Sequence, residues 1–158
     1  MLNQRLSTKL FLVAAISLCS WGCGSGERPF LQVQFCLTDT GGPAVLKQVV
    51  QDIARDEGME FTDRGAEAEA ELRSIDTQNP EIVSSFPLIM LSARRGDVGF
   101  SASNAGLGTH QVGMGFSRNN AEARAFANRA IQRLKQKWNL VRVPDDHGAF
   151  PLKNCPKG

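Results

Sequence analysis

Alternating hydrophobic and polar positions predict a strand over residues 30–37. The apolar positions of one face are Leu31, Val33, Phe35 and Leu37. The positions of the other face are Gln32, Gln34 and Cys36. This period of two indicates a strand with one face on the core and a second, polar face.

Apolar residues three and four positions apart predict two long helices. The first is expected to begin near Pro43 and to end at Gly58, with apolar positions at Val45, Leu46, Val49, Val50 and Ile53. The second opens at Asn119, with Asn119 and Glu122 in capping-box positions. Its apolar positions are Ala123, Phe126, Ala127, Ala130, Ile131, Leu134 and Trp138.

Further strands are predicted at 59–62, 88–93, 98–103, 111–117 and 140–143. The strands at 88–93 and 98–103 flank Arg94-Arg95-Gly96-Asp97, which is typical of a hairpin turn. Residues 64–75 are ambiguous, because Ala and Glu favour a helix but only Leu72 and Ile75 offer it an apolar stripe. Asn79-Pro80 breaks the chain, and the tail from Pro144 is expected to be a loop.

This order of elements predicts a single α+β domain over residues 30–158. We expect a mostly antiparallel sheet with two main helices on one face, in a ferredoxin-like or split βαβ arrangement with an added hairpin. Small and polar residues would line the other face, among them Gln32, Gln34, Gly113 and Gly115. That face is expected either to be open for a partner or to be covered by the C-terminal tail.

The first 22 residues have the composition of an export leader. Arg5 and Lys9 give a positive start, residues 10–18 form an apolar run too short to span a bilayer, and small residues follow. We therefore expect residues 1–22 to be removed and the mature protein to work outside the cytoplasm, with residues 23–29 as a flexible tether.

The sequence around Cys23, Ser20-Trp21-Gly22-Cys23-Gly24-Ser25, resembles the cleavage box of bacterial lipoproteins. The resemblance covers the leader only, and the family's aliphatic and small positions hold Ser20 and Trp21. It implies lipidation at Cys23 and, through Gly24, outer-membrane sorting. Cys19 has the aliphatic and small residues before it, but Leu18 stands where a small residue is needed. Ordinary cleavage after Gly22 or Gly24 is the alternative, which would leave a soluble periplasmic protein.

Two cysteines remain in the body of the mature chain, Cys36 and Cys155. An even pair in an oxidising compartment predicts a disulfide. Because Cys36 lies off the apolar face of its strand, the C-terminal tail is expected to cross that face and to be joined to it there. A catalytic thiol is the alternative, but it requires a nearby base, for which the chain offers only His110 and His147.

Charge excludes a general nucleic-acid or anionic-membrane binder. Arg5 and Lys9 account for the formal net charge of +2, so the mature chain is neutral. Acidic residues predominate before Gly99 and basic residues after it. The two sets either complement each other within the fold or steer one partner. The basic positions of the second helix that we consider for partner binding are Arg124, Arg129, Arg133 and Lys137.

No motif in the sequence is a strong indication of a catalytic or ligand-binding site. Gly106-Leu107-Gly108 and Gly113-Met114-Gly115 do not join a strand to a helix as phosphate loops do. Arg95-Gly96-Asp97 matches an adhesion tripeptide but also suits a tight turn. Asp145, Asp146 and His147 lack metal-ligand spacing, and the alternating acids Glu67, Glu69 and Glu71 would spread around a helix. We expect no metal and no cofactor.

The sequence therefore favours an exported, non-catalytic protein that binds another protein in the periplasm or cell envelope. It would act either as an immunity-type inhibitor or as an accessory lipoprotein of an envelope assembly. The alternative is a small periplasmic hydrolase or small-ligand-binding protein that uses His110 among the glycine-rich strands.

Overall fold

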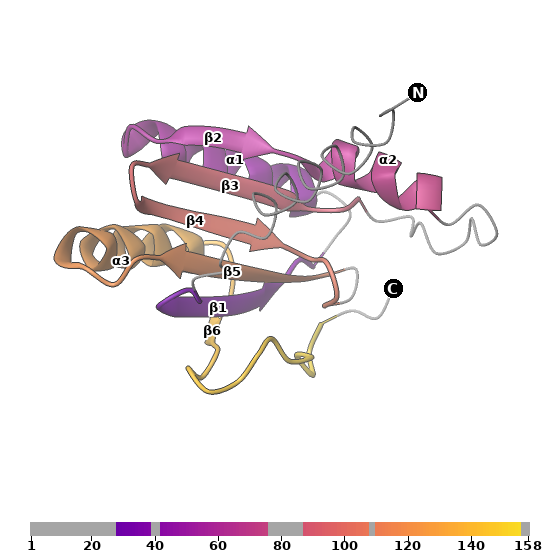
Figure 1. Cartoon of the computed structure of the whole chain (residues 1–158). Coiled ribbons are helices and arrows are strands. Elements are labelled where there is room, and N and C mark those ends of the chain that lie inside the picture. The colour runs from indigo at the N-terminus through magenta and orange to yellow at the C-terminus, as the bar shows by residue number, and fades with distance from the viewer. Residues whose placement is uncertain (1–27, 39–41, 76–86, 108–109, 156–158) are drawn as a thin grey trace, which may run out of the picture.

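The fold was analysed in a computed structural model, which describes residues 28–38, 42–75, 87–107 and 110–155. The predicted leader, Cys23, most of the tether and Asn79-Pro80 lie outside these residues. Figure 1 shows one sheet with two long helices behind it and a third helix at one end. The fold is α+β, as the sequence predicts.

Six strands form one antiparallel sheet in the order β2-β3-β4-β5-β1-β6. They are β1 (Leu31–Cys36), β2 (Glu60–Asp63), β3 (Met90–Arg95), β4 (Val98–Ser103), β5 (Gln111–Ser117) and β6 (Val141–Arg142). Since β1 is antiparallel to both β5 and β6, those two strands run the same way, and α3 (Ala121–Lys135) joins them as a split βαβ unit around β1. Strands β3 and β4 form the hairpin that is added to the ferredoxin-like arrangement.

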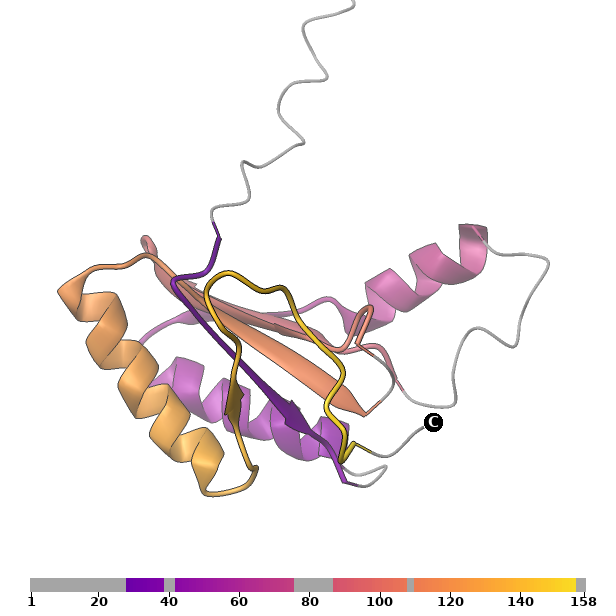
Figure 2. The same ribbon diagram turned by 90° about the horizontal axis from the view of Figure 1, so that it is seen from below.

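Helices α1 (Gly42–Asp56) and α3 cover one face of the sheet, as Figure 2 shows from below. Their apolar stripes meet the inward side chains of the strands in one core. Phe126 of α3 packs against two aromatic rings of the strands, with its centroid 5.7 Å from that of Phe100 and 5.9 Å from that of Phe116. The side chains at every second position of β1 and at every third or fourth position of both helices therefore form much of the core.

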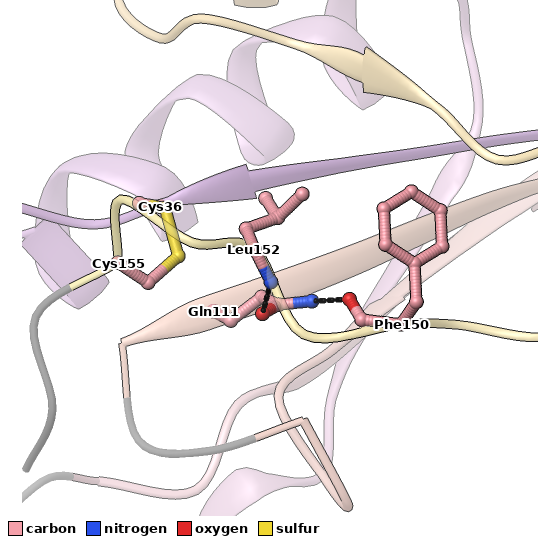
Figure 3. The surroundings of a disulfide bond; sticks show 5 residues. All are labelled: Cys36, Gln111, Phe150, Leu152 and Cys155. Carbon is pink, nitrogen blue, oxygen red and sulfur yellow. Dashed lines mark hydrogen bonds between the residues drawn. A yellow bond between two sulfur atoms is a disulfide. The ribbon is translucent and has the colours of Figure 1, made fainter.

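The C-terminal tail crosses the opposite face of the sheet and is joined to β1 by a disulfide. Cys36 and Cys155 are bonded, with their Cα atoms 5.2 Å apart (Figure 3). The tail passes over β1 and β5, where its backbone contacts Gln34 and Gln111. The predicted disulfide is confirmed, and so is the prediction that the tail covers part of this face.

Two details differ from or complete the sequence predictions. The N-cap of α3 is Asn120, not Asn119, because the Asn120 side chain accepts a hydrogen bond from the Ala123 amide at 2.8 Å.

The ambiguous segment forms α2 (Gly65–Ile75), which projects beyond the sheet and leaves Leu72 54 % exposed. Intrinsic helix propensity therefore outweighs the missing apolar stripe in α2.

Candidate binding face

The sheet face opposite α1 and α3 is divided into a covered part and an open part. In the covered part, Gln34 and Gln111 are buried beneath the tail. Gln111 donates from Nε2 to the Phe150 carbonyl at 2.7 Å and accepts at Oε1 from the Leu152 amide at 2.8 Å (Figure 3). Gln34, with its amide oriented to suit both groups, exchanges hydrogen bonds of 3.1 and 3.3 Å with Phe150. Side-chain amides thus bind the backbone of an extended segment.

We expect Gln111→Leu to loosen this tail. The substitution removes two hydrogen bonds and leaves the Leu152 amide without its side-chain partner, while the Phe150 carbonyl keeps its hydrogen bond from Gln34, so we expect a cost of about 1–3 kcal/mol. Hydrogen exchange at the Leu152 amide should therefore become faster, while Gln132→Leu on the exposed side of α3 should change neither exchange nor stability. Unchanged protection of Leu152 in Gln111→Leu would show that the disulfide alone holds the tail.

The open part is a shallow hollow of about 460 Å³ over β3, β4 and β5. We call it the open hollow. Its floor is a cross-strand row of Ser92, Ser101 and Gly115, one residue from each strand. Pro29, on the chain leading into β1, forms one wall and lies against Gly115. Small side chains on three adjacent strands therefore leave a flat surface with hydroxyl groups beside the covered part.

One end of the open hollow is charged. There Asp97, in the β3–β4 turn, lies 3.9 Å from Arg94 Nη2 and 3.3 Å from Arg118 Nη2. The Arg94 Nε group also donates to the Gly96 carbonyl at 2.6 Å. All three charged side chains are largely exposed, so these ion pairs contribute little to stability. Among the residues that line the hollow, two guanidinium groups face one carboxylate.

The basic residues predicted on the second helix are divided among different neighbours. Arg129 forms a bidentate ion pair with Glu57, with hydrogen bonds of 2.7 and 2.8 Å, and Arg133 forms an ion pair with Asp56 at 2.7 Å. Arg124 donates to the side chain of Asn119. Lys137 lines a separate hollow of about 280 Å³ near the disulfide, together with Lys153 and Trp138. The basic second half of the chain thus complements the acidic first half partly within the fold.

These interhelix pairs lower the pKa values of both acids. The hydrogen bond from Arg133 lowers the pKa of Asp56 below its ordinary 3.8, and the hydrogen bond from Arg129 lowers the pKa of Glu57 below its ordinary 4.5. Because each pKa is lower in the folded state, the pairs stabilise the fold above the unfolded pKa values. That contribution is lost as the pH falls through the folded values.

We therefore expect the Asp56→Asn/Glu57→Gln variant to lose less stability on acidification than the wild type. Urea unfolding should be compared near neutral pH and below 3.8, the lower of the two ordinary values. Arg73→Gln, which alters an exposed pair within α2 at 3.8 Å, is the control and should follow the wild type. Equal pH slopes for the wild type and the double variant would contradict a role for the interhelix pairs.

The two histidines lie in different surroundings. His110 precedes β5, is partly buried, and its carbonyl accepts from the Leu37 amide at 2.7 Å. His147 is in the exposed tail, with Nδ1 2.8 Å from Asp146. Within the described ranges, no group of three or more His, Cys, Asp or Glu side chains is placed to hold a metal ion. Neither histidine lines the open hollow.

The motif residues have structural partners. Gly96 lies in the β3–β4 turn with φ 57°, and the adjacent Arg95 pairs with Glu122 of α3 at 2.8 Å. Gly113 and Gly115 belong to β5, as the strand pattern predicts. Glu69 accepts a hydrogen bond from the Leu88 amide at 2.6 Å. The Arg-Gly-Asp sequence therefore forms a hairpin turn, and Gly113-Met114-Gly115 forms a strand.

The residues of the open hollow were largely missed by sequence reasoning. The sequence identified Gly115 on this face but not Ser92, Ser101, Arg94 or Arg118. A signal was present, because positions 92 and 94 alternate with the buried Leu91 and Ala93.

No helix in the described part is long and apolar enough to cross a membrane. No protein-family model and no curated protein sequence matches the chain.

Proposed function

We propose that this protein is an exported, lipid-anchored domain that binds another protein in the periplasm or cell envelope. The open hollow carries the proposal. It is a flat area of small and hydroxyl side chains on three adjacent strands, next to a part of the same face that already holds an extended polypeptide. A segment of a second protein is the occupant that we propose for this face.

A non-catalytic role is supported by the chemistry of the hollow. Among the described residues that line it, Asp97 is the one carboxylate, and it lies between two arginines. Serine hydroxyls line the hollow, but neither a cysteine nor a histidine does, so the described lining lacks the histidine base that activates a serine in many covalent mechanisms. The immunity-type inhibitor and the accessory envelope lipoprotein both require a binding surface of this kind.

Export and anchoring are supported by the leader and by the disulfide. Cys36 and Cys155 form a bond that is typical of proteins in oxidising compartments. Lipidation of Cys23 follows from the resemblance to lipoprotein leaders, and Cys23→Ser should move the protein from the membrane fraction to the soluble periplasmic fraction. Membrane retention of Cys23→Ser would contradict lipidation at this residue.

The binding function is tested by cross-linking the native protein in the envelope of the organism that makes it. The protein is then purified, and its partners are identified by mass spectrometry. We expect one dominant partner in a fixed ratio, and we expect its association to slow at high salt if charge steers the encounter. A purification that yields the same proteins as an unrelated exported bait would contradict the proposal.

A further inference from the structure

We propose that the hollow beside the disulfide binds a small organic anion, whose charged group lies near Lys137 and Lys153 and whose flat apolar part packs on Trp138. We call it the disulfide hollow. It has a volume of about 280 Å³ and is lined by residues that follow α3, by β6, by the end of β1 and by the C-terminal tail. The inference concerns a second site and does not depend on the proposed function.

One wall of the disulfide hollow follows the end of α3. The Lys137 and Trp138 amides both donate to the Leu134 carbonyl, at 3.0 and 2.9 Å, which fixes the turn that carries these two side chains. Trp138 is partly buried and stacks on Phe35 of β1, with ring centroids 5.2 Å apart. Because the indole is held by the core and also lines the hollow, it provides an aromatic surface for a flat apolar group.

A second wall is formed by the C-terminal tail. The Cys155 amide donates to the Leu152 carbonyl at 3.3 Å, and Lys153 and Asn154 lie in the turn that this hydrogen bond closes. The disulfide with Cys36 fastens that turn to the end of β1 (Figure 3). The disulfide hollow therefore depends on the tail being held in this place.

The polar groups of the disulfide hollow are suited to an anion. Lys137 and Lys153 contribute two ammonium groups, and no described residue of the lining is acidic. Neither lysine forms an ion pair with another described residue. The side-chain amides of Asn139 and Asn154 also line the hollow and form no hydrogen bond within the described chain, so each can donate to an oxyanion.

The size and charge of the disulfide hollow together define the class of ligand. An anion that fills it displaces water from around the ammonium groups, and the lower local dielectric strengthens their attraction to the bound charge. A volume of about 280 Å³ is just below the usual range for drug-sized ligands. The site therefore suits a compact anion, a carboxylate or a phosphate, that is built on a single ring.

The test uses the fluorescence of Trp138. The sequence contains two tryptophans, so Trp21→Phe in the full-length protein leaves the indole of the disulfide hollow as the only one. Benzoate and phenyl phosphate are the probes, and benzamide is the neutral analogue of benzoate. We expect both anions to change the fluorescence saturably with a Kd below about 1 mM, and benzamide to bind at least about tenfold more weakly. Isothermal titration calorimetry measures the same affinities without relying on the indole.

Charge variants distinguish this site from a general attraction of anions to the protein. Lys137→Gln/Lys153→Gln should raise the Kd for benzoate at least about tenfold. Lys135→Gln is the matched control and should bind as the parent does, because Lys135 is an exposed lysine of α3 that does not line the hollow. Reduction of the disulfide should also weaken binding, because it releases the tail that carries Lys153. Circular dichroism shows that each form compared is folded.

The outcomes decide each part of the inference. Absence of saturable binding of both anions, by fluorescence and by calorimetry, would overturn it. Equal affinity for benzamide and benzoate would contradict the role of the anionic group, and equal losses in Lys135→Gln and the double lysine variant would contradict the assignment of the site. Full binding by reduced, folded protein would remove the tail from the site. None of these results bears on the proposed function, which rests on the open hollow over β3, β4 and β5.

Discussion

Replacing both Cys36 and Cys155 by serine is expected to lower the free energy of unfolding by about 3–5 kcal/mol. The bond joins residues separated by 119 positions, so it restricts nearly the whole unfolded domain. In the folded state it also fixes the end of the tail on β1, next to the hydrogen bonds from Gln111. Urea unfolding of the oxidised wild type and the double serine variant measures the difference.

The reduced wild type is the matched control, because it lacks the bond but keeps the sulfur atoms. It should unfold at nearly the same urea concentration as the double serine variant. Hydrogen exchange of the tail amides should become faster in both. A loss of less than about 1 kcal/mol, with the tail still protected, would mean that the loop-entropy estimate does not apply to this fold.

Phe126→Ala is expected to cost about 3–5 kcal/mol. The ring is fully buried in α3 and packs against Phe100 and Phe116 of the central strands. Removing it leaves a cavity at the junction of helix and sheet that the rigid strands cannot fill. Phe126→Leu keeps most of the volume and should cost roughly 1–2 kcal/mol.

The exposed neighbour Asn128 provides the second control, and Asn128→Ala should change stability by less than about 0.5 kcal/mol. Chemical unfolding at one temperature is sufficient to compare the three variants. A cost for Phe126→Ala close to that for Phe126→Leu would indicate that the α3–sheet junction collapses around the missing ring.

Strong periodic patterns predicted most of the fold. The alternation in β1 and β5 and the helical spacing in α1 and α3 match most of the buried residues, because one side of each element faces a single core. Val45 is an exception, because this predicted stripe position of α1 is 44 % exposed. The disulfide was predicted from the even pair of cysteines in an exported chain, and the position of Cys36 off the apolar face of β1 predicted where the tail is joined. Helix α2 was ambiguous because it projects from the sheet, so burial leaves no stripe in its sequence.

The candidate site was predicted less well, for a physical reason. Its floor consists of Ser92, Ser101 and Gly115, which are small residues in three strands. Alternation within a strand places such residues on the polar face but does not mark them as one joint surface. They become one surface only when the register places them side by side. Conversely, Arg129 and Arg133 stood out in the sequence, but they pair with acidic residues of the first helix region. Cross-strand register and interhelix pairing are tertiary properties.

The tail and the partner that we propose would use different halves of the polar sheet face. The tail takes the β1 side, held by Gln34, Gln111 and the disulfide, and leaves the β3–β4 side open. A reduced protein with a loosened tail would present a wider and different face. We therefore expect the integrity of the bond between Cys36 and Cys155 to affect partner binding as well as stability.

The most direct measurement of the central claim compares partner capture by Ser101→Trp and Gln132→Trp. Both positions are exposed, but Ser101 lies in the floor of the open hollow and Gln132 on the far side, in α3. The account predicts that Ser101→Trp abolishes capture while Gln132→Trp captures as much partner as the wild type. Undiminished capture by Ser101→Trp, with loss in Gln132→Trp, would place the binding surface on the helices and contradict the account.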